Sequence, residues 1–390
     1  MNSKSQKVTL ALLLFNLFIA FVGISLVIPV MPSLMNELSI SGTVLGNMVA
    51  AFALTQLIVS PITGKWTDRF GRKIMIIIGL VLFSISEFLF GIGQSIEVLF
   101  ISRILGGVSA GCIMPAVTAF IADITTPTER PKALGYMSAS ISTGFIIGPG
   151  IGGFLAELGT RVPFFAAAIL AAAAAVMSLV LLKEPEQKEF VNEELKNQQS
   201  GWKKILLPIY LLPFLIIFLS TFSLSSFESL LSLYVDHKFG FTPMDIAILV
   251  TGGGLIGAIA QVLLFDVFTR KFGEINLVRY SLLLSALLVF LLTIVQTYWT
   301  VLITCCIVFV GFDLIRPGVT SYLSKIAGNE QGFVGGLNSM FTSLGNIFGP
   351  VIGGYLFDLN FNFPYYFATI ILIFCIFVAI LWRKPNGETM

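Results

Sequence analysis

Residues 144–153 read GFIIGPGIGG, and residues 345–354 read GNIFGPVIGG. The two stretches lie 201 residues apart in a chain of 390 residues, so the offset is about half the chain. Six glycine and proline positions match between them: Gly135, Gly144, Gly148, Pro149, Gly152 and Gly153 in the first copy, and Gly336, Gly345, Gly349, Pro350, Gly353 and Gly354 in the second. Repetition at this distance predicts a chain built from two copies of one helical unit.

The composition places these units in a membrane. Hydrophobic residues make up 56% of the chain, charged residues make up 11%, and the mean hydropathy is +0.94. That is too few charges for a water-exposed surface of this size. Apolar runs such as residues 74–80 are continuous, whereas the strands of a membrane β-barrel alternate apolar and polar residues.

A helix needs about 20 mostly apolar residues to cross a bilayer. Twelve such stretches are present, at residues 8–32, 43–63, 74–95, 98–123, 134–158, 162–182, 205–235, 244–265, 276–295, 299–324, 333–357 and 363–382. We therefore expect an all-α integral membrane protein with 12 transmembrane helices arranged as two pseudo-symmetric six-helix bundles. The first stretch has no small-residue cleavage site, so we interpret it as a membrane anchor.

One long polar segment divides the chain. Residues 183–203 are rich in Glu and Lys and contain almost no aliphatic run. We expect an N-terminal bundle over residues 1–182, a cytoplasmic linker over 183–204 and a C-terminal bundle over 205–390. Shorter copies support this division: residues 69–71 (RFG) resemble residues 271–273 (KFG), and residues 114–118 (MPAVT) resemble residues 316–320 (RPGVT).

Basic residues predict the orientation. Of the 23 Lys and Arg residues, Arg103 and Arg316 lie inside spans, and Arg161 and Lys238 lie on one side of the membrane. The other 19 lie on the opposite side, together with both termini. Because cytoplasmic loops carry an excess of Lys and Arg, we expect both termini in the cytoplasm.

Five ionisable residues lie inside the predicted spans, where charge is costly and usually marks a functional site. Glu228 lies in the seventh span with no basic residue within a turn. Asp313 and Arg316 are three residues apart in the tenth span, so they share a helix face and either pair with each other or both line a cavity. Glu87 lies in the third span and Arg103 in the fourth.

Unpaired carboxylates suit the exchange of a proton for a cation. In a low-dielectric cavity such a group holds a proton and releases it when a cation arrives. We expect Glu228 and Asp313 to do this, with a structural hydrogen bond as the alternative for Glu228, and we favour a helix–helix hydrogen bond for Glu87. Aromatic faces attract cations and amides are polar, so the possible cavity residues are Phe145, Phe227, Phe312, Gln56, Asn338 and Asn346.

Several other functional classes find little support. The chain has no GxxxxGK[ST] phosphate loop, so ATP is not the expected energy source. His237 is the single histidine, and no HExxH motif, Cys/His metal spacing or serine elbow accompanies it, which disfavours a membrane enzyme and predicts no metal or cofactor. No filter-like loop of a channel is repeated.

Residues 64–73 read GKWTDRFGRK, and this loop resembles the signature loop of the major facilitator superfamily. The glycine-proline run at 144–153 resembles the antiporter motif of the drug/proton antiporters in that superfamily. Residues 23–32 (GISLVIPVMP) resemble their first-span motif, and residues 99–107 (LFISRILGG) resemble the fourth-span motif. Over nearly its full length, the chain is similar to bacterial multidrug efflux pumps of the NorA/Bmr type.

The resemblance implies efflux of hydrophobic, often cationic drugs by alternating access, driven by the proton motive force without a cofactor. It also implies a bacterial cytoplasmic membrane protein whose partners are drugs, lipophilic cations, protons and lipid rather than nucleic acid, and which works as a monomer. A narrow metabolite exporter or importer is the alternative, although a polar sugar would favour more Asn, Gln and Trp residues than this chain offers. A membrane enzyme is a more remote alternative.

The resemblance further assigns gating and coupling roles. Asp68 is expected to hold the cytoplasmic side closed against a helix start in the other half, and Arg72 to pair with Asp123. Arg270 replaces Asp68 in the second copy, so this lock is expected to be one-sided. Arg103 resembles the coupling arginine of the fourth span, with the capping of an interfacial carboxylate as the alternative.

Glycines four residues apart let helix backbones approach closely, and a proline inside a helix bends it. We expect the glycine-proline runs to form a flexible seal between the halves, with ordinary helix packing as the alternative. The residues with an expected gating role are Gly64, Asp68, Arg72, Asp123, Gly144, Gly148, Pro149, Gly152, Gly153, Gly349 and Pro350.

Overall fold

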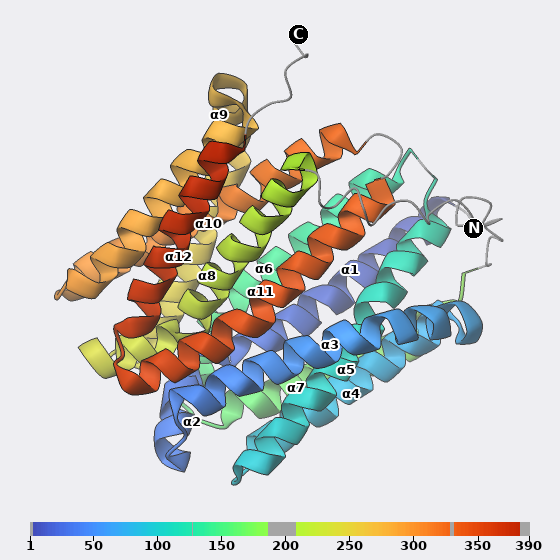
Figure 1. The fold of residues 1–390 in the computed structure, drawn as a ribbon. Helices are drawn as coiled ribbons and strands as arrows, with labels where there is room; N and C mark the ends of the chain where they lie inside the picture. Colours follow the sequence, from blue (N-terminus) through green and yellow to red (C-terminus); the bar gives the residue numbers. More distant parts are fainter. Residues whose placement is uncertain (1–2, 127, 186–207, 328–330, 383–390) are drawn as a thin grey trace. The chain divides into compact units, whose positions relative to one another are not determined.

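The structure is a computed structural model that describes residues 3–126, 128–185, 208–327 and 331–382. The chain divides into two compact units, Met1–Glu189 with Gly240–Thr251, and Phe190–Phe239 with Gly252–Met390. All regular structure in the described residues is helical, as Figure 1 shows. Most of the predicted linker falls on residues 186–207, outside the described residues, so the predicted bundle boundaries stay predictions.

The first unit contains the helices up to residue 181: α1 (Ser3–Leu26), η1 (Ile28–Val30), α2 (Met31–Leu38), α3 (Gly42–Phe70), α4 (Arg72–Ile92), α5 (Ile96–Ile124), α6 (Arg130–Ala156) and α7 (Val162–Leu181). The second unit contains α8 (Pro208–Phe239), α9 (Pro243–Ile294) from residue 252 onward, α10 (Tyr298–Ile326), α11 (Gln331–Leu359) and α12 (Phe363–Leu381). An all-helical structure is expected, because a bilayer core offers no partner for backbone polar groups outside the chain.

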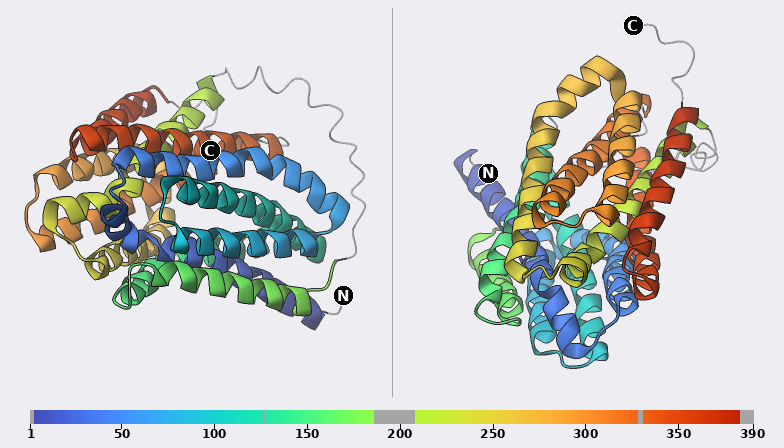
Figure 2. Two further views of the ribbon diagram at one scale, coloured as in Figure 1. Left: turned by 90° about the horizontal axis from the view of Figure 1, so that it is seen from below. Right: turned by 90° about the vertical axis from the view of Figure 1, so that its left-hand side faces the viewer.

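Eleven helices of the described residues are long and apolar enough to cross a membrane, one fewer than the 12 predicted spans. The difference lies in α9, which covers the predicted spans at 244–265 and 276–295. At Gly273 inside α9 the backbone has a φ of 77° and a ψ of 161°, a conformation that glycine adopts without steric cost. The chain doubles back in this region, as the gold segment in the right-hand view of Figure 2 shows, so α9 consists of two helical spans that meet at the turn around Gly273.

The core of the first unit is apolar. Residues of α1, α4 and α5, such as Leu17, Leu80 and Phe120, are fully buried in one cluster. Within this apolar interior, the side-chain amide of Asn16 on α1 donates to Ser178 Oγ on α7 over 2.7 Å. A buried hydrogen bond of this kind fixes how the two helices align, because leaving either group unpaired in an apolar interior is costly.

The repeated glycines serve helix packing in both units. A Cβ added at Gly144 on α6 would lie 2.9 Å from the carbonyl oxygen of Phe18 on α1, and one at Gly148 would overlap the same helix. In the second unit, a Cβ at Gly345 on α11 would lie 2.8 Å from the α8 backbone, and one at Gly349 2.5 Å from it. Both copies therefore bring two helix backbones into contact inside a unit. A role as a seal between the halves stays a prediction.

Candidate functional site

The expected gating and coupling residues fall on seven helices. The residues with an expected gating role lie on α3 (Gly64, Asp68), α4 (Arg72), α5 (Asp123), α6 (Gly144, Gly148, Pro149, Gly152, Gly153) and α11 (Gly349, Pro350). The expected coupling residues lie on α5 (Arg103), α8 (Glu228) and α10 (Asp313, Arg316).

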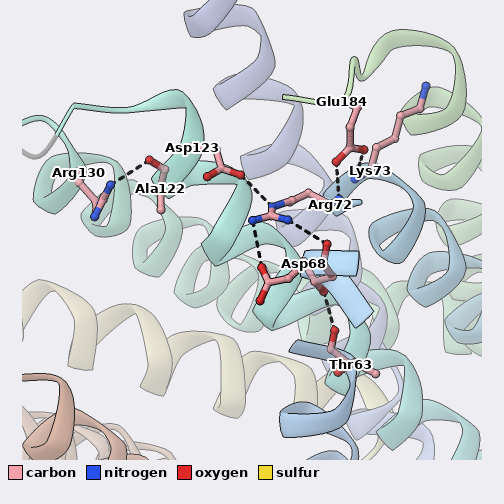
Figure 3. A network of polar contacts seen from close by, with 9 residues as sticks. Thr63, Asp68, Arg72, Lys73, Ala122, Asp123, Arg130 and Glu184 are labelled. Atoms are coloured by element: carbon pink, nitrogen blue, oxygen red, sulfur yellow. Dashed lines mark hydrogen bonds and ion pairs between the residues drawn. The ribbon is translucent and has the colours of Figure 1, made fainter. Parts of the chain in front are cut away.

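The connection between α3 and α4 is organised around Arg72. Its Nε donates to Asp123 Oδ2 over 2.8 Å, its second terminal nitrogen lies 3.0 Å from Asp68 Oδ1, and its first donates to the carbonyl of Thr67 over 3.0 Å. Figure 3 shows the guanidinium between the two carboxylates. The pairing of Arg72 with Asp123, which the family resemblance implied, is confirmed.

The two ion pairs of Arg72 differ in their surroundings. The side chains of Arg72 and Asp123 are 10% and 3% exposed, whereas that of Asp68 is 73% exposed. Removing one partner of a buried pair costs about 3–5 kcal/mol, because it leaves the other charge uncompensated. An exposed pair contributes about 0.2–1 kcal/mol. The buried pair with Asp123 therefore contributes most to holding Arg72 in place. The exposed pair between Asp68 and Arg72 contributes little to stability.

Glu184 belongs to the predicted linker, yet its carboxylate lies at the start of α4. It accepts hydrogen bonds from the backbone nitrogens of Arg72 (2.5 Å) and Lys73 (2.9 Å), as Figure 3 shows. The preceding Gly71 has a φ of 104°, and a Cβ there would lie 2.9 Å from the Glu184 side chain. The free N–H groups and partial positive charge of a helix start favour such a carboxylate. The sequence indicates a turn at Gly71, but it gives no sign that Glu184 contacts the helix start that follows.

The second unit holds an ion pair at the corresponding turn of α9. Lys325 Nζ on α10 contacts Glu274 Oε1, which lies one residue after Gly273, and Ser321 Oγ donates to the same oxygen over 3.4 Å. The Lys325 side chain is 58% exposed and that of Glu274 is 8% exposed. The sequence comparison had noted only that Arg270 replaces Asp68 at this turn, and it missed this pair.

Glu228, Asp313 and Arg316 carry no hydrogen bond or ion pair on their side chains within the described part of the chain. Glu228 is exposed on α8, Asp313 is half-buried on α10, and Arg316 is exposed. Asp313 and Arg316 therefore do not pair with each other in this structure, and the alternative that both line a cavity stays a prediction. The charge of Asp313 acts on Glu228, so these two carboxylates are electrostatic neighbours within the second unit.

Phe227 and Phe312 lie in an aromatic cluster of the second unit. The Phe227 ring is fully buried, 6.1 Å from the rings of both Phe309 and Phe312 and 5.7 Å from that of Tyr365. Both side chains are buried in this structure, and a cavity role for Phe227 and Phe312 stays a prediction. Successive residues of a helix point about 100° apart, so Phe227 can face the core while the adjacent Glu228 is exposed.

The other possible cavity residues are less buried. Phe145 is 41% exposed, and its ring lies 5.1 Å from that of Phe21. Asn346 Oδ1 accepts a hydrogen bond from Ser225 Oγ over 2.7 Å. Gln56 and Asn338 are half-buried, and a cavity role for these four residues stays a prediction.

Glu87 and Arg103 lie together in the first unit. A terminal nitrogen of Arg103 on α5 donates to Glu87 Oε1 on α4 over 3.2 Å, and the guanidinium lies 4.1 Å from the centre of the Phe90 ring. The helix–helix hydrogen bond predicted for Glu87 is confirmed. Of the two alternatives for Arg103, the structure contains the carboxylate cap, and a coupling role stays a prediction.

A family model matches most of the chain. The model described as "Major Facilitator Superfamily" matches residues 13–334 and 213–389. The chain is 65% identical over 382 residues to "Multidrug resistance protein 1" of Bacillus subtilis (strain 168), with 98% of both chains covered. It is 45% identical over 376 residues to "Quinolone resistance protein NorA" of Staphylococcus aureus (strain MRSA252), with 96% of this chain and 97% of that protein covered.

Solved structures share the arrangement of helices at low sequence identity. A bacterial homologue of the human lysosomal transporter Spinster, in an inward-facing and occupied conformation, has a TM-score of 0.84 at 15% identity and covers 98% of this chain and 97% of that one. The nucleoside transporter NupG has a TM-score of 0.74 at 15% identity, with 98% of both chains covered. At such identities the likeness concerns the fold alone.

Proposed function

The chain belongs to the Major Facilitator Superfamily, and on this premise we propose that it exports structurally diverse hydrophobic, often cationic drugs in exchange for protons. The names of its relatives concern resistance to several drugs and to quinolones, which supports drugs as the cargo. The exporter acts as a monomer in a bacterial cytoplasmic membrane, with both termini in the cytoplasm and no cofactor. The bias of 19 among 23 basic residues toward one side supports this orientation.

The observation that carries the proposal is the pair of carboxylates in the second unit. Glu228 and Asp313 are electrostatic neighbours, and within the described residues neither has an ion-pair partner. Two like charges close together in a low-dielectric setting do not ionise independently, so a shared proton relieves their repulsion. An arriving lipophilic cation relieves it equally well, and the proton is then released.

This exchange couples export to the proton motive force. A proton that moves inward releases about 2.3 kcal/mol per 100 mV of membrane potential, to which the pH gradient adds. Rocking of the two halves about a central site would present the carboxylates to each side of the membrane in turn. In this scheme the Asp68–Arg72–Asp123 cluster takes part in closing the cytoplasmic side, and Arg103 supports coupling through its contact with Glu87.

A reconstitution experiment tests the proposal. Purified protein in liposomes is given an imposed pH gradient, and the accumulation of tetraphenylphosphonium and ethidium is measured together with proton release. We expect each substrate to dissipate the gradient, and a protonophore to abolish accumulation against a concentration gradient. Accumulation at an unchanged rate and extent after the gradient is collapsed would exclude proton exchange. Empty liposomes serve as the control for passive partition of the dyes.

A further inference from the structure

The Asp313 side chain lies against α9 at a glycine. A Cβ added at Gly257 would overlap Oδ2 of Asp313, and it would lie 3.2 Å from the Asp313 Cγ and 3.5 Å from the Phe309 Cβ. One turn earlier on α9, a Cβ at Gly253 would overlap the Phe309 ring. The two glycines thus form a slot, here called the α9 slot, which receives Phe309 and Asp313 of α10.

In the corresponding helix contact of the first unit, the glycine lies on the other helix of the pair. Residues 69–71 and 271–273 correspond with an offset of 202 residues, as do residues 114–118 and 316–320. With this offset Asp313 corresponds to Gly111, and Gly257 corresponds to Thr55. A Cβ at Gly111 on α5 would lie 3.1 Å from the Val59 side chain on α3. Glycine therefore lies on α5 in the first unit and on α9 in the second, where α10 is left free to carry a carboxylate.

Few other charges act on this carboxylate. Glu228 on α8 is its like-charged neighbour, and Arg316 on α10 is exposed and three residues away. The remaining charged or titratable residues on the helices that pack against α10 are Asp236, His237, Lys238, Asp245, Asp266, Arg270, Lys271, Glu274, Arg279 and Asp358, and Lys325 lies on α10 itself. On α9 the nearest of these, Asp266, is nine residues from Gly257, or about 13 Å along the helix axis. The contact with Gly257 therefore bears directly on where the Asp313 carboxylate lies relative to Glu228.

We propose that Gly257 is a positioning residue for Asp313, which it seats against the α9 backbone at a fixed place relative to Glu228. This inference rests on the proposed proton exchange, because it assigns a consequence to where the carboxylate lies. An aspartate side chain is short, so an added methyl group is avoided only by a change of rotamer or a shift of the helix. Either response moves the carboxylate while leaving its chemistry intact.

The test compares alanine substitutions at neighbouring glycines of α9. Gly257→Ala displaces Asp313, and Gly253→Ala displaces the Phe309 ring instead. Gly252→Ala is the matched control, because its Cβ would lie 3.8 Å from Cys306 Sγ, an ordinary contact. In proteoliposomes we expect Gly257→Ala to lower proton-coupled export of tetraphenylphosphonium by about 10- to 100-fold. We also expect it to move the pH of half-maximal tetraphenylphosphonium binding by about half a unit or more.

A double substitution separates positioning from general damage. In an Asp313→Ala background the overlap is gone, so Gly257→Ala should have no further effect on tetraphenylphosphonium binding. If Gly257→Ala alone accumulates poorly in membranes, the double variant should restore its amount, and failure to do so would contradict the steric link. Reaction of Asp313 with dicyclohexylcarbodiimide, followed by mass spectrometry, should change in Gly257→Ala and stay as in wild type in Gly252→Ala.

The outcomes distinguish the two proposals. A wild-type protein whose export ignores the pH gradient overturns the proposed function whatever the glycine variants do. A coupled wild type, combined with Gly257→Ala and Gly252→Ala proteins that share one pH profile and one carbodiimide reactivity, overturns the positioning role alone.

Discussion

Glu274 and Lys325 form an ion pair at the positions that correspond to Arg72 and Asp123, with the two charges exchanged. The offset of 202 residues that relates the two glycine turns, Gly71 and Gly273, relates the partners of both pairs. Coulomb energy depends on the product of two charges, so a pair of either polarity stabilises the same helix contact. The two units therefore have an ion pair at the same place, but the acid and the base have exchanged positions.

The exchange extends to a third position. Asp68, which lies 3.0 Å from Arg72, corresponds to Arg270, which is exposed on α9. The first unit thus has the order acid, base, acid, and the second has base, acid, base. Comparison of Asp68 with Arg270 alone suggests that the second unit has lost the motif. Comparison of all three positions shows that the charge at each position is inverted.

The two ion pairs should differ in their contribution to stability. Arg72→Met removes the partner of the buried Asp123 and should lower the free energy of unfolding by about 3–5 kcal/mol. Lys325→Met keeps similar bulk and leaves the Glu274 carboxylate, which is 8% exposed, without its basic partner, but the lost lysine is itself 58% exposed, so we expect a smaller loss than for Arg72→Met. Unfolding of the detergent-solubilised variants measures both values. Equal losses would contradict this ranking.

The polarity of the second pair should be reversible. Lys325→Glu places a carboxylate against Glu274 and should destabilise the protein through like-charge repulsion. The double variant Glu274→Lys/Lys325→Glu should recover most of this loss, because it restores an attractive pair. The same unfolding measurement applies, with Lys325→Met as the neutral reference. A double variant no more stable than Lys325→Glu would show that the contact is not electrostatic.

Binding of a cation should depend on pH through Glu228. In the proposed exchange a proton and a cation compete for the carboxylates, so raising the pH strengthens cation binding. For each proton released, the logarithm of the dissociation constant falls by up to about one per pH unit. Glu228→Gln removes one titrating group and should flatten this slope in equilibrium binding of tetraphenylphosphonium. An unchanged slope in Glu228→Gln would show that Glu228 does not couple the two ligands.

The repeated glycines should fall into two groups. A Cβ at Gly152 would overlap the carbonyl of Leu26, a backbone atom that has no freedom to move aside, so Gly152→Ala should destabilise the protein by about 1–3 kcal/mol. Gly135 and Gly336 belong to the same repeat, yet nothing lies within 4 Å of a Cβ at either. Alanine at these two positions should leave stability unchanged or raise it by about 0.5–1 kcal/mol. Thermal unfolding separates the groups, and equal destabilisation at Gly135 and Gly152 would refute packing as the cause.

The carboxylate of Glu184 should stabilise the start of α4. Glu184→Ala removes the acceptor for two backbone N–H groups and should cost about 0.5–2 kcal/mol, as the loss of a helix cap does. Glu184→Gln keeps an acceptor oxygen without the charge and should lose less. Hydrogen exchange at Arg72 and Lys73 reports the effect locally. Unchanged exchange in Glu184→Ala would mean that these N–H groups do not depend on the cap.

The helical character of the chain and its duplicated layout follow from the amino-acid order alone. A bilayer leaves backbone groups no partner outside the chain, so long apolar runs become helices wherever they occur. Spacing alone also identifies Gly144 and Gly345, and Gly148 and Gly349, as corresponding positions of the two copies, because duplication preserves distance along the chain. The pairing of Arg72 with Asp123 was available through the family motif and was confirmed.

Which face each side chain presents depended on how the helices pack. Phe227 turned into an aromatic core while the adjacent Glu228 stayed exposed, because neighbouring positions on a helix point in different directions and packing selects among them. The seat of Asp313 against Gly257 joins two helices whose contact no local pattern encodes. Covalent order thus sets what can be a helix and what is repeated, and contacts between distant segments set which acids remain without partners.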